Sequence, residues 1–288
     1  MKIAIASGKG GTGKTFFSVN LAHSLDRELL LLDCDVEEPN VNLFLKGELV
    51  EQRDSTLLVP QVDLDLCDGC RVCADFCQFN AIAVIRGVPL IFEDLCHGCG
   101  GCTLFCPQKA MDDTPHKIGV ISHYHKGKIS LIEGRLDVGK ALAVPVIRDV
   151  KGDKEVAKHP LVILDAPPGT SCPVVWSLSG CDLAILVTEG TPFGLHDLKL
   201  AVETVREVGI PFGVVVNRDG LGDERVVTYC QEENIPVVGK IPNDREIATL
   251  YAQGKIVVDE LPHYRALFTQ IWENIASLAK GGRYERVQ

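Results

Sequence analysis

The sequence lacks several features that would place it in whole classes of protein. No apolar run approaches the roughly 18 residues that a transmembrane helix needs. No apolar core followed by a small-residue cleavage site stands at the start, so no secretory signal peptide is indicated. Basic residues do not prevail: 29 Lys and Arg stand against 39 Asp and Glu, giving a net charge of -10. Because phosphate binding needs a basic surface, we expect no nucleic-acid partner. The first two observations lead us to expect a cytoplasmic protein with no stable membrane insertion.

Cysteine, in contrast, is abundant and concentrated in one segment. Of 12 cysteines, eight lie in two runs that share the spacing C-x-x-C-x-x-C-x-x-x-C. The first run contains Cys67, Cys70, Cys73 and Cys77, and the second contains Cys96, Cys99, Cys102 and Cys106. In a chain without a secretory signal, such cysteines indicate metal ligation in a reducing compartment rather than disulfides.

The spacing is that of bacterial two-cluster ferredoxins, in which the fourth cysteine of each run binds the cluster held mainly by the other run. One predicted [4Fe-4S] cluster is bound by Cys67, Cys70, Cys73 and Cys106, and the second by Cys96, Cys99, Cys102 and Cys77. Zinc sites or a disulfide framework are the alternative, but zinc pairs do not require a third and a fourth cysteine at this repeated spacing. Gln78 replaces the proline that usually follows the fourth cysteine, whereas Cys106 keeps Pro107. The proline donates no ligand, so we still expect Cys77 to bind.

A glycine-rich motif near the start of the chain predicts nucleotide binding. Residues 8–15 satisfy G-x-x-x-x-G-K-[ST], between an apolar strand pattern and a helical pattern. The motif consists of Gly8, Lys9, Gly10, Gly11, Thr12, Gly13, Lys14 and Thr15. In such a loop the backbone N–H groups hold phosphate oxygens, Lys14 reaches the β- and γ-phosphates, and the Thr15 hydroxyl binds Mg²⁺. ATP and Mg²⁺ are therefore predicted cofactors.

Apolar runs that end in carboxylates predict the sheet behind this loop. Residues 29–32 lead to Asp33, and residues 161–164 lead to Asp165, as buried parallel strands deliver acids to the carboxyl edge of a sheet. Asp165 suits a metal-binding Walker B acid, and the N–H of Gly169 could contact a γ-phosphate. Further apolar runs at 183–187, 212–217 and 237–242 alternate with helical stretches at 195–208 and 224–233. This alternation predicts an α/β fold with a doubly wound, mostly parallel sheet.

The general motif does not require a lysine at position 9. The form Gly-Lys-Gly-Gly-x-Gly-Lys-Thr resembles the deviant Walker A motif of the MinD/ParA/Mrp ATPases, which are related to the nitrogenase iron protein. The resemblance implies an ATP-dependent homodimer, or a heterodimer with a paralogue, in which Lys9 contacts nucleotide across the interface. It also implies that Asp35 orients the attacking water, that Asp33 supports Mg²⁺ through water, and that Asn217 contacts adenine with Pro242 nearby. The predicted catalytic residues are Lys9, Lys14, Asp35 and Asp165.

The cysteine runs interrupt this ATPase pattern. ATPase segments at residues 1–56 and 116–288 flank an insert at residues 57–115, a combination similar to MinD-type ATPases that contain an inserted ferredoxin-like (α+β) domain. Residues 118–150 are expected to form strands and turns. Cys172 lies seven residues after Asp165, an offset resembling that of a cluster ligand in the nitrogenase iron protein. No second cysteine stands at a matching place, so a bridging cluster is not predicted.

Three functions follow from these motifs. The first is an ATP-hydrolysing iron-sulfur protein that couples nucleotide-driven dimer switching to electron transfer through two clusters toward a partner protein. The second is an ATP-dependent assembly factor for Fe–S or mixed-metal clusters, whose partner is a metallocluster client. It is weakened because the chain lacks the C-terminal C-x-x-C typical of the Mrp branch. The third, a MinD/ParA-like positioning ATPase, is disfavoured by the acidic charge.

Overall fold

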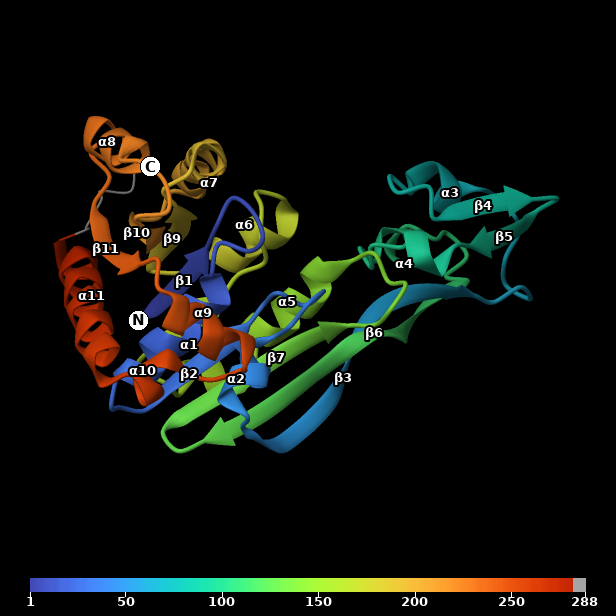
Figure 1. Cartoon of the computed structure of the whole chain (residues 1–288). Helices are drawn as coiled ribbons and strands as arrows, with labels where there is room; N and C mark the ends of the chain where they lie inside the picture. The colour runs from blue at the N-terminus through green and yellow to red at the C-terminus, as the bar shows by residue number, and fades with distance from the viewer. Residues whose placement is uncertain (282–288) are drawn as a thin grey trace. The chain divides into compact units, whose positions relative to one another are not determined.

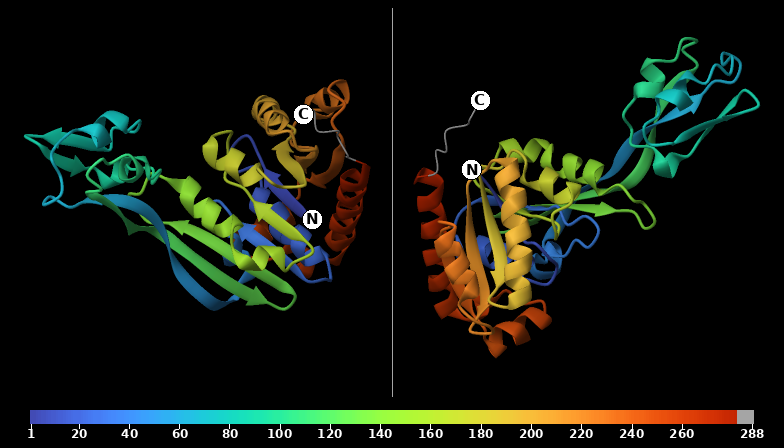
Figure 2. Two further views of the ribbon diagram at one scale, coloured as in Figure 1. Left: turned by 180° about the vertical axis from the view of Figure 1, so that it is seen from behind. Right: turned by 90° about the horizontal axis from the view of Figure 1, so that it is seen from above.

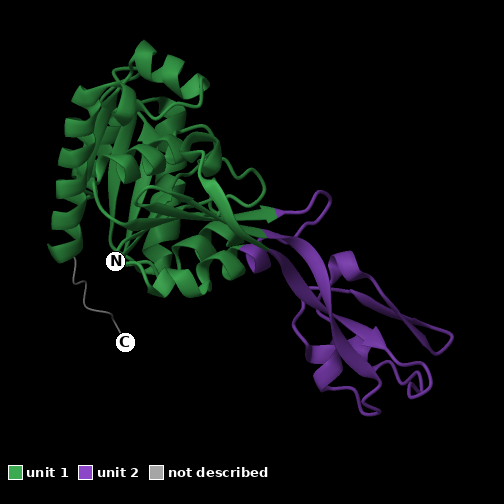
Figure 3. Ribbon diagram, turned by 90° about the horizontal axis from the view of Figure 1, so that it is seen from below, with its two compact units in different colours: residues 1–52, 121–135, 147–288 green, residues 53–120, 136–146 purple. Residues whose placement is uncertain are grey.

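The computed structural model describes residues 1–281 and divides into two compact units. Unit 1 comprises residues 1–52, 121–135 and 147–288, and unit 2 comprises residues 53–120 and 136–146 (Figure 3). The predicted insert, residues 57–115, falls within unit 2. Unit 2 also contains residues 136–146, which the sequence assigned to the ATPase. No helix within residues 1–281 is long and apolar enough to cross a membrane.

Within the described residues, nine strands form one sheet in the order β11-β10-β9-β1-β8-β2-β7-β6-β3 (Figure 1). The strands are β1 (Lys2–Ala6), β2 (Leu29–Asp33), β3 (Glu48–Val62), β6 (Met111–Lys126), β7 (Ile129–Leu136), β8 (Val162–Asp165), β9 (Leu183–Glu189), β10 (Phe212–Asp219) and β11 (Val237–Pro242). All pairings from β11 through to β7 are parallel. The structure therefore confirms the large, mostly parallel sheet that the alternating pattern predicts.

Helices cover both faces of this sheet in unit 1 (Figure 2). They are α1 (Lys14–Ser24), α2 (Val41–Leu45), α5 (Ala143–Lys151), α6 (Cys172–Leu178), α7 (Pro192–Val208), α8 (Arg225–Glu232), α9 (Arg245–Ala252), α10 (Val257–Glu260) and α11 (Pro262–Gly281), with a 3-10 turn η2 (Lys154–Ala157). Helix α1 packs with α10 and α11, and α6 and α7 contact β1 and β9. Alternate residues of each strand face the two layers, so that Ile3 and Ile5 of β1 join the core beneath α1 and α11.

The structure corrects one expectation within residues 118–150. Residues Ala143–Lys151 form helix α5 rather than strands and turns. Pro145 lies in the first turn, where a helix does not need the missing N–H group. Val146, Ile147 and Val150 are fully buried on one side of the helix. This spacing is helical, and the proline obscured it in the sequence.

Unit 2 has little regular structure apart from parts of long strands. Strands β4 (Ile82–Ile85) and β5 (Val88–Ile91) form an antiparallel hairpin, closed by Arg86 and Gly87 at positive φ of 52° and 82°. Short helices α3 (Val72–Phe76) and α4 (Gly101–Leu104) contact each other, and a 3-10 turn η1 (Glu93–Leu95) precedes the second cysteine run. The small core of this unit contains Cys73, Ile82, Cys102 and Met111. Cysteines thus occupy positions where a domain of this size would otherwise place aliphatic side chains.

Candidate functional sites

The glycine-rich loop connects the end of β1 to the start of α1 in unit 1. Gly13 precedes the first turn of α1 with φ of 95°, a conformation that favours glycine. A side chain there would also overlap the Asn217 amide, whose Nδ2 donates to the Thr12 carbonyl at 2.8 Å. Lys14 and Thr15 follow in the first turn and are buried. The loop therefore presents helical N–H groups in the arrangement that suits phosphate oxygens.

Three carboxylates lie side by side at the carboxyl edge of the sheet. Asp33 of β2 pairs in register with Asp165 of β8 on one side and with Glu133 of β7 on the other. Asp165 accepts hydrogen bonds from the hydroxyls of Thr15 and Ser18. Burial raises the pKa of Asp33 well above its usual value, and the charges of Asp165 and Glu133 add to this shift. Burial also raises the pKa of Asp165, and the positive charge of Lys14 opposes that shift.

Asp35 lies two residues beyond the end of β2 and faces the same site. Burial raises its pKa to about 6, opposed by the charge of Lys14 and assisted by the charges of Asp165 and Glu38. At neutral pH the carboxylate is mostly ionised, yet its pKa is close enough to 7 for it to accept a proton. The geometry is therefore compatible with the water-orienting role that the resemblance implies for this residue.

The glycine-rich loop and Asp35 border a cavity of about 420 Å³ in unit 1. Of the predicted residues, the cavity is lined by Gly10, Gly11, Gly13, Lys14, Thr15, Asp35, Asn217 and Pro242. The sequence missed Asn40, Arg218, Asp244 and Tyr251, which also line it. Tyr251 lies on α9 and stacks on Phe44 of α2, with ring centroids 4.8 Å apart. A tyrosine in an amphipathic helix carries no motif, so only the tertiary fold could identify it.

Six predicted residues do not line the cavity, namely Gly8, Lys9, Thr12, Asp33, Asp165 and Gly169. Gly8 lies against α7, where a side chain would overlap the carbonyl of Asp197. Lys9 forms an ion pair with Asp197 at 3.6 Å. The N–H of Gly169 donates to the carbonyl of Ser7 at 3.0 Å, although the neighbouring Pro168 does line the cavity. The start of the loop is therefore anchored to α7 in this structure.

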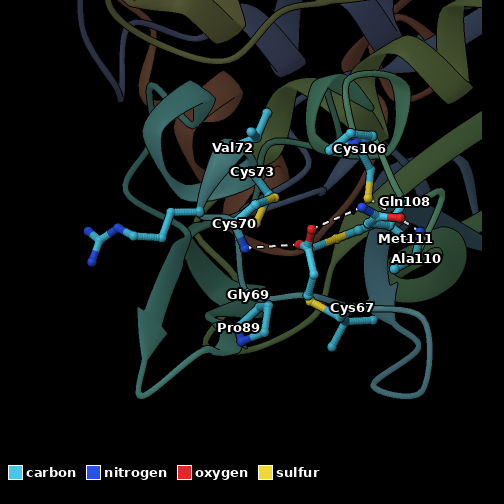
Figure 4. A pocket seen from close by; sticks show the side chains of 14 residues that line it. Cys67, Gly69, Cys70, Val72, Cys73, Pro89, Cys106, Gln108, Ala110 and Met111 are labelled. Carbon is cyan, nitrogen blue, oxygen red and sulfur yellow. Dashed lines mark hydrogen bonds between the residues drawn. The ribbon is translucent and has the colours of Figure 1, made fainter.

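The eight cysteines of the two runs line two separate cavities in unit 2. The first, cavity 1, is lined by Cys67, Cys70, Cys73 and Cys106 (Figure 4). The second, cavity 2, is lined by Cys77, Cys96, Cys99 and Cys102. Each cavity thus combines three cysteines of one run with the fourth cysteine of the other. Apolar side chains complete the walls, among them Met111 in cavity 1 and Ile82 in cavity 2.

The cysteine sets can be compared with what a single ion and a multi-iron cluster require. A zinc ion holds all its ligands within about 2.0–2.3 Å of one point. Within residues 1–281, no three Cys, His, Asp or Glu side chains are arranged to hold a single metal ion. A [4Fe-4S] cluster binds each thiolate to a different iron and therefore needs thiolates spread around a cavity. The donor set of each cavity, four thiols and apolar walls, fits such a cluster.

The remaining cysteines lie in unit 1. Cys172 is exposed at the first residue of α6. Cys34, Cys181 and Cys230 are buried, and burial raises the pKa of each thiol.

A loop that holds phosphates at the start of α1, with acids at the ends of β2 and β8, defines a P-loop nucleotide-binding protein. Comparison with family models agrees, because residues 3–258 match the CobQ/CobB/MinD/ParA nucleotide binding domain. The chain belongs to this family.

Individual relatives extend over nearly the whole chain. An uncharacterized protein of Methanocaldococcus jannaschii is 31% identical over 285 residues, covering 96% of this chain and 96% of the relative. An iron-sulfur cluster carrier protein of Aquifex aeolicus is 28% identical over 280 residues, covering 90% of this chain and 62% of the relative. Among solved structures, the septum site-determining protein MinD from Pyrococcus horikoshii, complexed with Mg-ADP, matches with a TM-score of 0.59. That match covers 96% of each chain at 20% identity, so it shows the fold alone.

Proposed function

We propose that this ATPase couples its nucleotide state to electron transfer through two [4Fe-4S] clusters held by unit 2, toward a partner protein. The observation that carries the proposal is the sorting of eight cysteines into two cavities of four, in a chain with a nucleotide site. Each cavity provides a complete ligand set. A fully ligated cluster is better suited to carrying electrons than to being handed to another protein.

In this proposal unit 2 is a ferredoxin-like domain. Cavity 1 would hold a cluster through Cys67, Cys70, Cys73 and Cys106, and cavity 2 through Cys77, Cys96, Cys99 and Cys102. The short helices α3 and α4 each contribute one buried ligand, Cys73 and Cys102. The clusters would supply one-electron redox chemistry that protein side chains cannot provide.

The nucleotide site offers a role for each of its residues. Lys14 would bind the β- and γ-phosphates, and Thr15, Asp33 and Asp165 would hold Mg²⁺, partly through water. The carboxylate of Asp35 would orient the attacking water. Asn217 and Pro242 would border the adenine.

Lys9 gives a reason to expect an ATP-dependent dimer, either a homodimer or a heterodimer with a paralogue. In the single chain its ammonium group pairs with Asp197 at 3.6 Å and does not line the nucleotide cavity. Its side chain is about one third exposed. A weak, partly exposed ion pair of this kind can exchange for a stronger contact with the phosphates of nucleotide bound by a second subunit.

Chain connectivity supplies a route from nucleotide to clusters. Strand β7 carries Glu133 beside Asp33 and then continues to Leu136, the first residue of the second segment of unit 2. Asp33 also accepts the N–H groups of Asn40 and Val41, at the start of α2, which leads into β3. A change at the nucleotide site is thus connected through the backbone to both segments of unit 2.

Iron and acid-labile sulfide analysis of anaerobically prepared protein tests the cluster part of this proposal. We expect both clusters in the wild type and about half the iron and sulfide in Cys106→Ser, because only cavity 1 loses a ligand. Cys172→Ser is the matched control and should keep the full content. Zinc in place of iron, or equal losses in both variants, would argue against the assignment.

A second candidate function is ATP-dependent assembly of Fe–S or mixed-metal clusters on a client protein. The similarity to the Aquifex aeolicus iron-sulfur cluster carrier protein favours it. A transfer assay separates the two functions: the loaded protein is incubated with an apo-ferredoxin and ATP, and iron is measured on each protein afterwards. ATP-dependent movement of iron to the acceptor favours assembly, whereas retention of iron favours electron transfer.

A further inference from the structure

The two cysteine runs form an internal repeat, so each cysteine at cavity 1 has a counterpart at cavity 2. Cys67 corresponds to Cys96, and Cys106 corresponds to Cys77. Among the positions that differ in chemistry between the copies, two form a pair. The residue after the first cysteine is Asp68 in one copy and His97 in the other, and the second residue after the fourth cysteine is Gln108 or Phe79.

The structure brings these two variable positions together at both cavities. At cavity 1, Gln108 Nε2 donates to Asp68 Oδ2 at 2.9 Å. At cavity 2, the rings of Phe79 and His97 stack with centroids 3.8 Å apart and planes 10° from parallel. All four residues line their cavities. The same two positions of the repeat are therefore in contact at both cavities. At cavity 1 the contact joins a carboxylate and an amide, and at cavity 2 it joins two rings.

The backbone N–H groups near the first cysteine of each run also differ between the two cavities. At cavity 1 the N–H of Cys70 donates to Asp68 Oδ1 at 3.1 Å, so this donor is turned toward the carboxylate. At cavity 2 the N–H of Gly98 donates to the sulfur of Cys96 at 3.4 Å. Within residues 1–281, the corresponding N–H of Gly69 makes no such bond to Cys67. The fourth cysteines are equivalent, with an N–H···S bond of 3.3 Å to Cys106 and 3.4 Å to Cys77.

Two other charged side chains, Asp113 and Arg71, would act against the effect of a carboxylate at the rim of cavity 1. Asp113 accepts from the hydroxyl of Thr103 at 2.8 Å and does not line cavity 2, although its charge adds to burial in raising the pKa of the Cys96 and Cys102 thiols. Arg71 lines cavity 1, and its side chain is exposed like that of Asp68, so water screens both charges. Asp68 is the acidic residue that lines a cavity and is also held there by two hydrogen bonds.

We propose that Asp68 makes the cluster bound in cavity 1 the harder of the two to reduce. This inference rests on the proposed function. Reduction adds one negative charge to a cluster, and a fixed carboxylate at the rim disfavours that charge. An N–H group donated to a ligand sulfur has the opposite effect. The cavity-2 cluster is consequently the one on which a single added electron resides.

Redox titration of the fully loaded chain, followed by electron paramagnetic resonance, tests this inference. We expect two midpoint potentials in the wild type, and Asp68→Asn should move the lower one to a less negative value while the upper one stays in place. Arg71→Gln is the matched control from the same rim and should move the lower potential less than Asp68→Asn does, and in the opposite direction. Cys106→Ser, which removes a cavity-1 ligand, should abolish the lower-potential signal and so identifies it.

The reciprocal variant keeps the inference testable if Asp68→Asn does not load fully. His97→Asp places a carboxylate at the corresponding rim of cavity 2 and should make the upper potential more negative. Unchanged potentials in a fully loaded variant, or movement of the wrong potential, would overturn the role of Asp68. A wild-type chain that binds no iron would instead overturn the proposed function itself, so the two failures are distinguishable.

Discussion

At the scale of single residues, the acids at the sheet edge differ in what burial does to them. Asp33 and Asp165 are completely buried, and burial raises the pKa of both. Asp35 is half-buried, with its pKa raised to about 6, close to the physiological range. Burial is thus the main cause of all three shifts, and under the proposed function Asp33 and Asp165 would support the metal ion while Asp35 would orient water.

The titration of Asp35 predicts the pH dependence of ATP hydrolysis. The raised pKa means that the ionised, water-orienting form is lost as pH falls through about 6. We expect the turnover rate at pH 5 to be about one tenth of that at pH 7, since a tenfold loss accompanies each unit below the pKa. Steady-state phosphate release across this range measures it.

Glu38 provides the control for this pH profile. Its charge raises the pKa of Asp35, so Glu38→Gln should shift the fall in rate to lower pH. Asp35→Asn should remove turnover at every pH while nucleotide still binds. A wild-type profile that stays flat between pH 7 and pH 5 would contradict the role of Asp35.

Gly13 offers a second test at the residue scale. Gly13→Ala should lower the free energy of unfolding by about 1–3 kcal/mol, because a left-handed backbone and an overlap with Asn217 both oppose a side chain. Gly10→Ala, where a side chain meets no atom within 4 Å, should change it by less than about 0.5 kcal/mol. Chemical denaturation of the nucleotide-free variants measures both values, and equal effects would refute the packing argument.

At the scale of elements, the ion pair between the glycine-rich loop and α7 holds Lys9 away from the nucleotide cavity. The pair is partly exposed, and such pairs stabilise a fold by less than about 1 kcal/mol. Its significance is therefore conformational, because it determines where Lys9 lies before nucleotide binds.

Asp197→Asn should consequently leave the unfolding free energy almost unchanged but strengthen ATP-dependent self-association. The freed Lys9 no longer has to leave a carboxylate before it contacts nucleotide on another subunit. Sedimentation velocity with and without ATP measures the dimer fraction, and Lys9→Ala should abolish the response in either background. A variant that dimerises no more readily than the wild type would contradict this account of the pair.

Sequence patterns predicted the central elements, the cysteines of both cavities in unit 2 and much of the loop side of the nucleotide cavity, but not the rest of the nucleotide cavity wall. The runs ending in Asp33 and Asp165 were identifiable because fully buried parallel strands are continuously apolar. Helix α5 was missed because Pro145 interrupts its pattern. Tyr251, Arg218 and Asn40 were missed because each belongs to an ordinary helix, strand end or loop, and only packing brings them to the nucleotide cavity.

At the scale of the whole molecule, the structure contains two kinds of site in two compact units of one chain. Unit 1 contains the nucleotide cavity, and unit 2 contains both cysteine cavities. The cysteine assignment could be predicted from the repeat spacing alone. The rim contacts that distinguish the two cavities could be identified only from the structure. The central claim is that these sites are energetically coupled, so that nucleotide binding changes the redox behaviour of the clusters.

If the two kinds of site are coupled, nucleotide binding changes the cluster potentials of the same chain. This change can be measured without knowing the partner protein. The most direct test is an anaerobic redox titration of the loaded chain with no nucleotide, with ADP and with a non-hydrolysable ATP analogue, in the presence of Mg²⁺. The account predicts that the ATP analogue shifts at least one cluster potential relative to ADP, and that Lys14→Ala, which cannot hold the phosphates, shows no shift. Identical potentials in all three nucleotide states of the wild type would contradict the coupling.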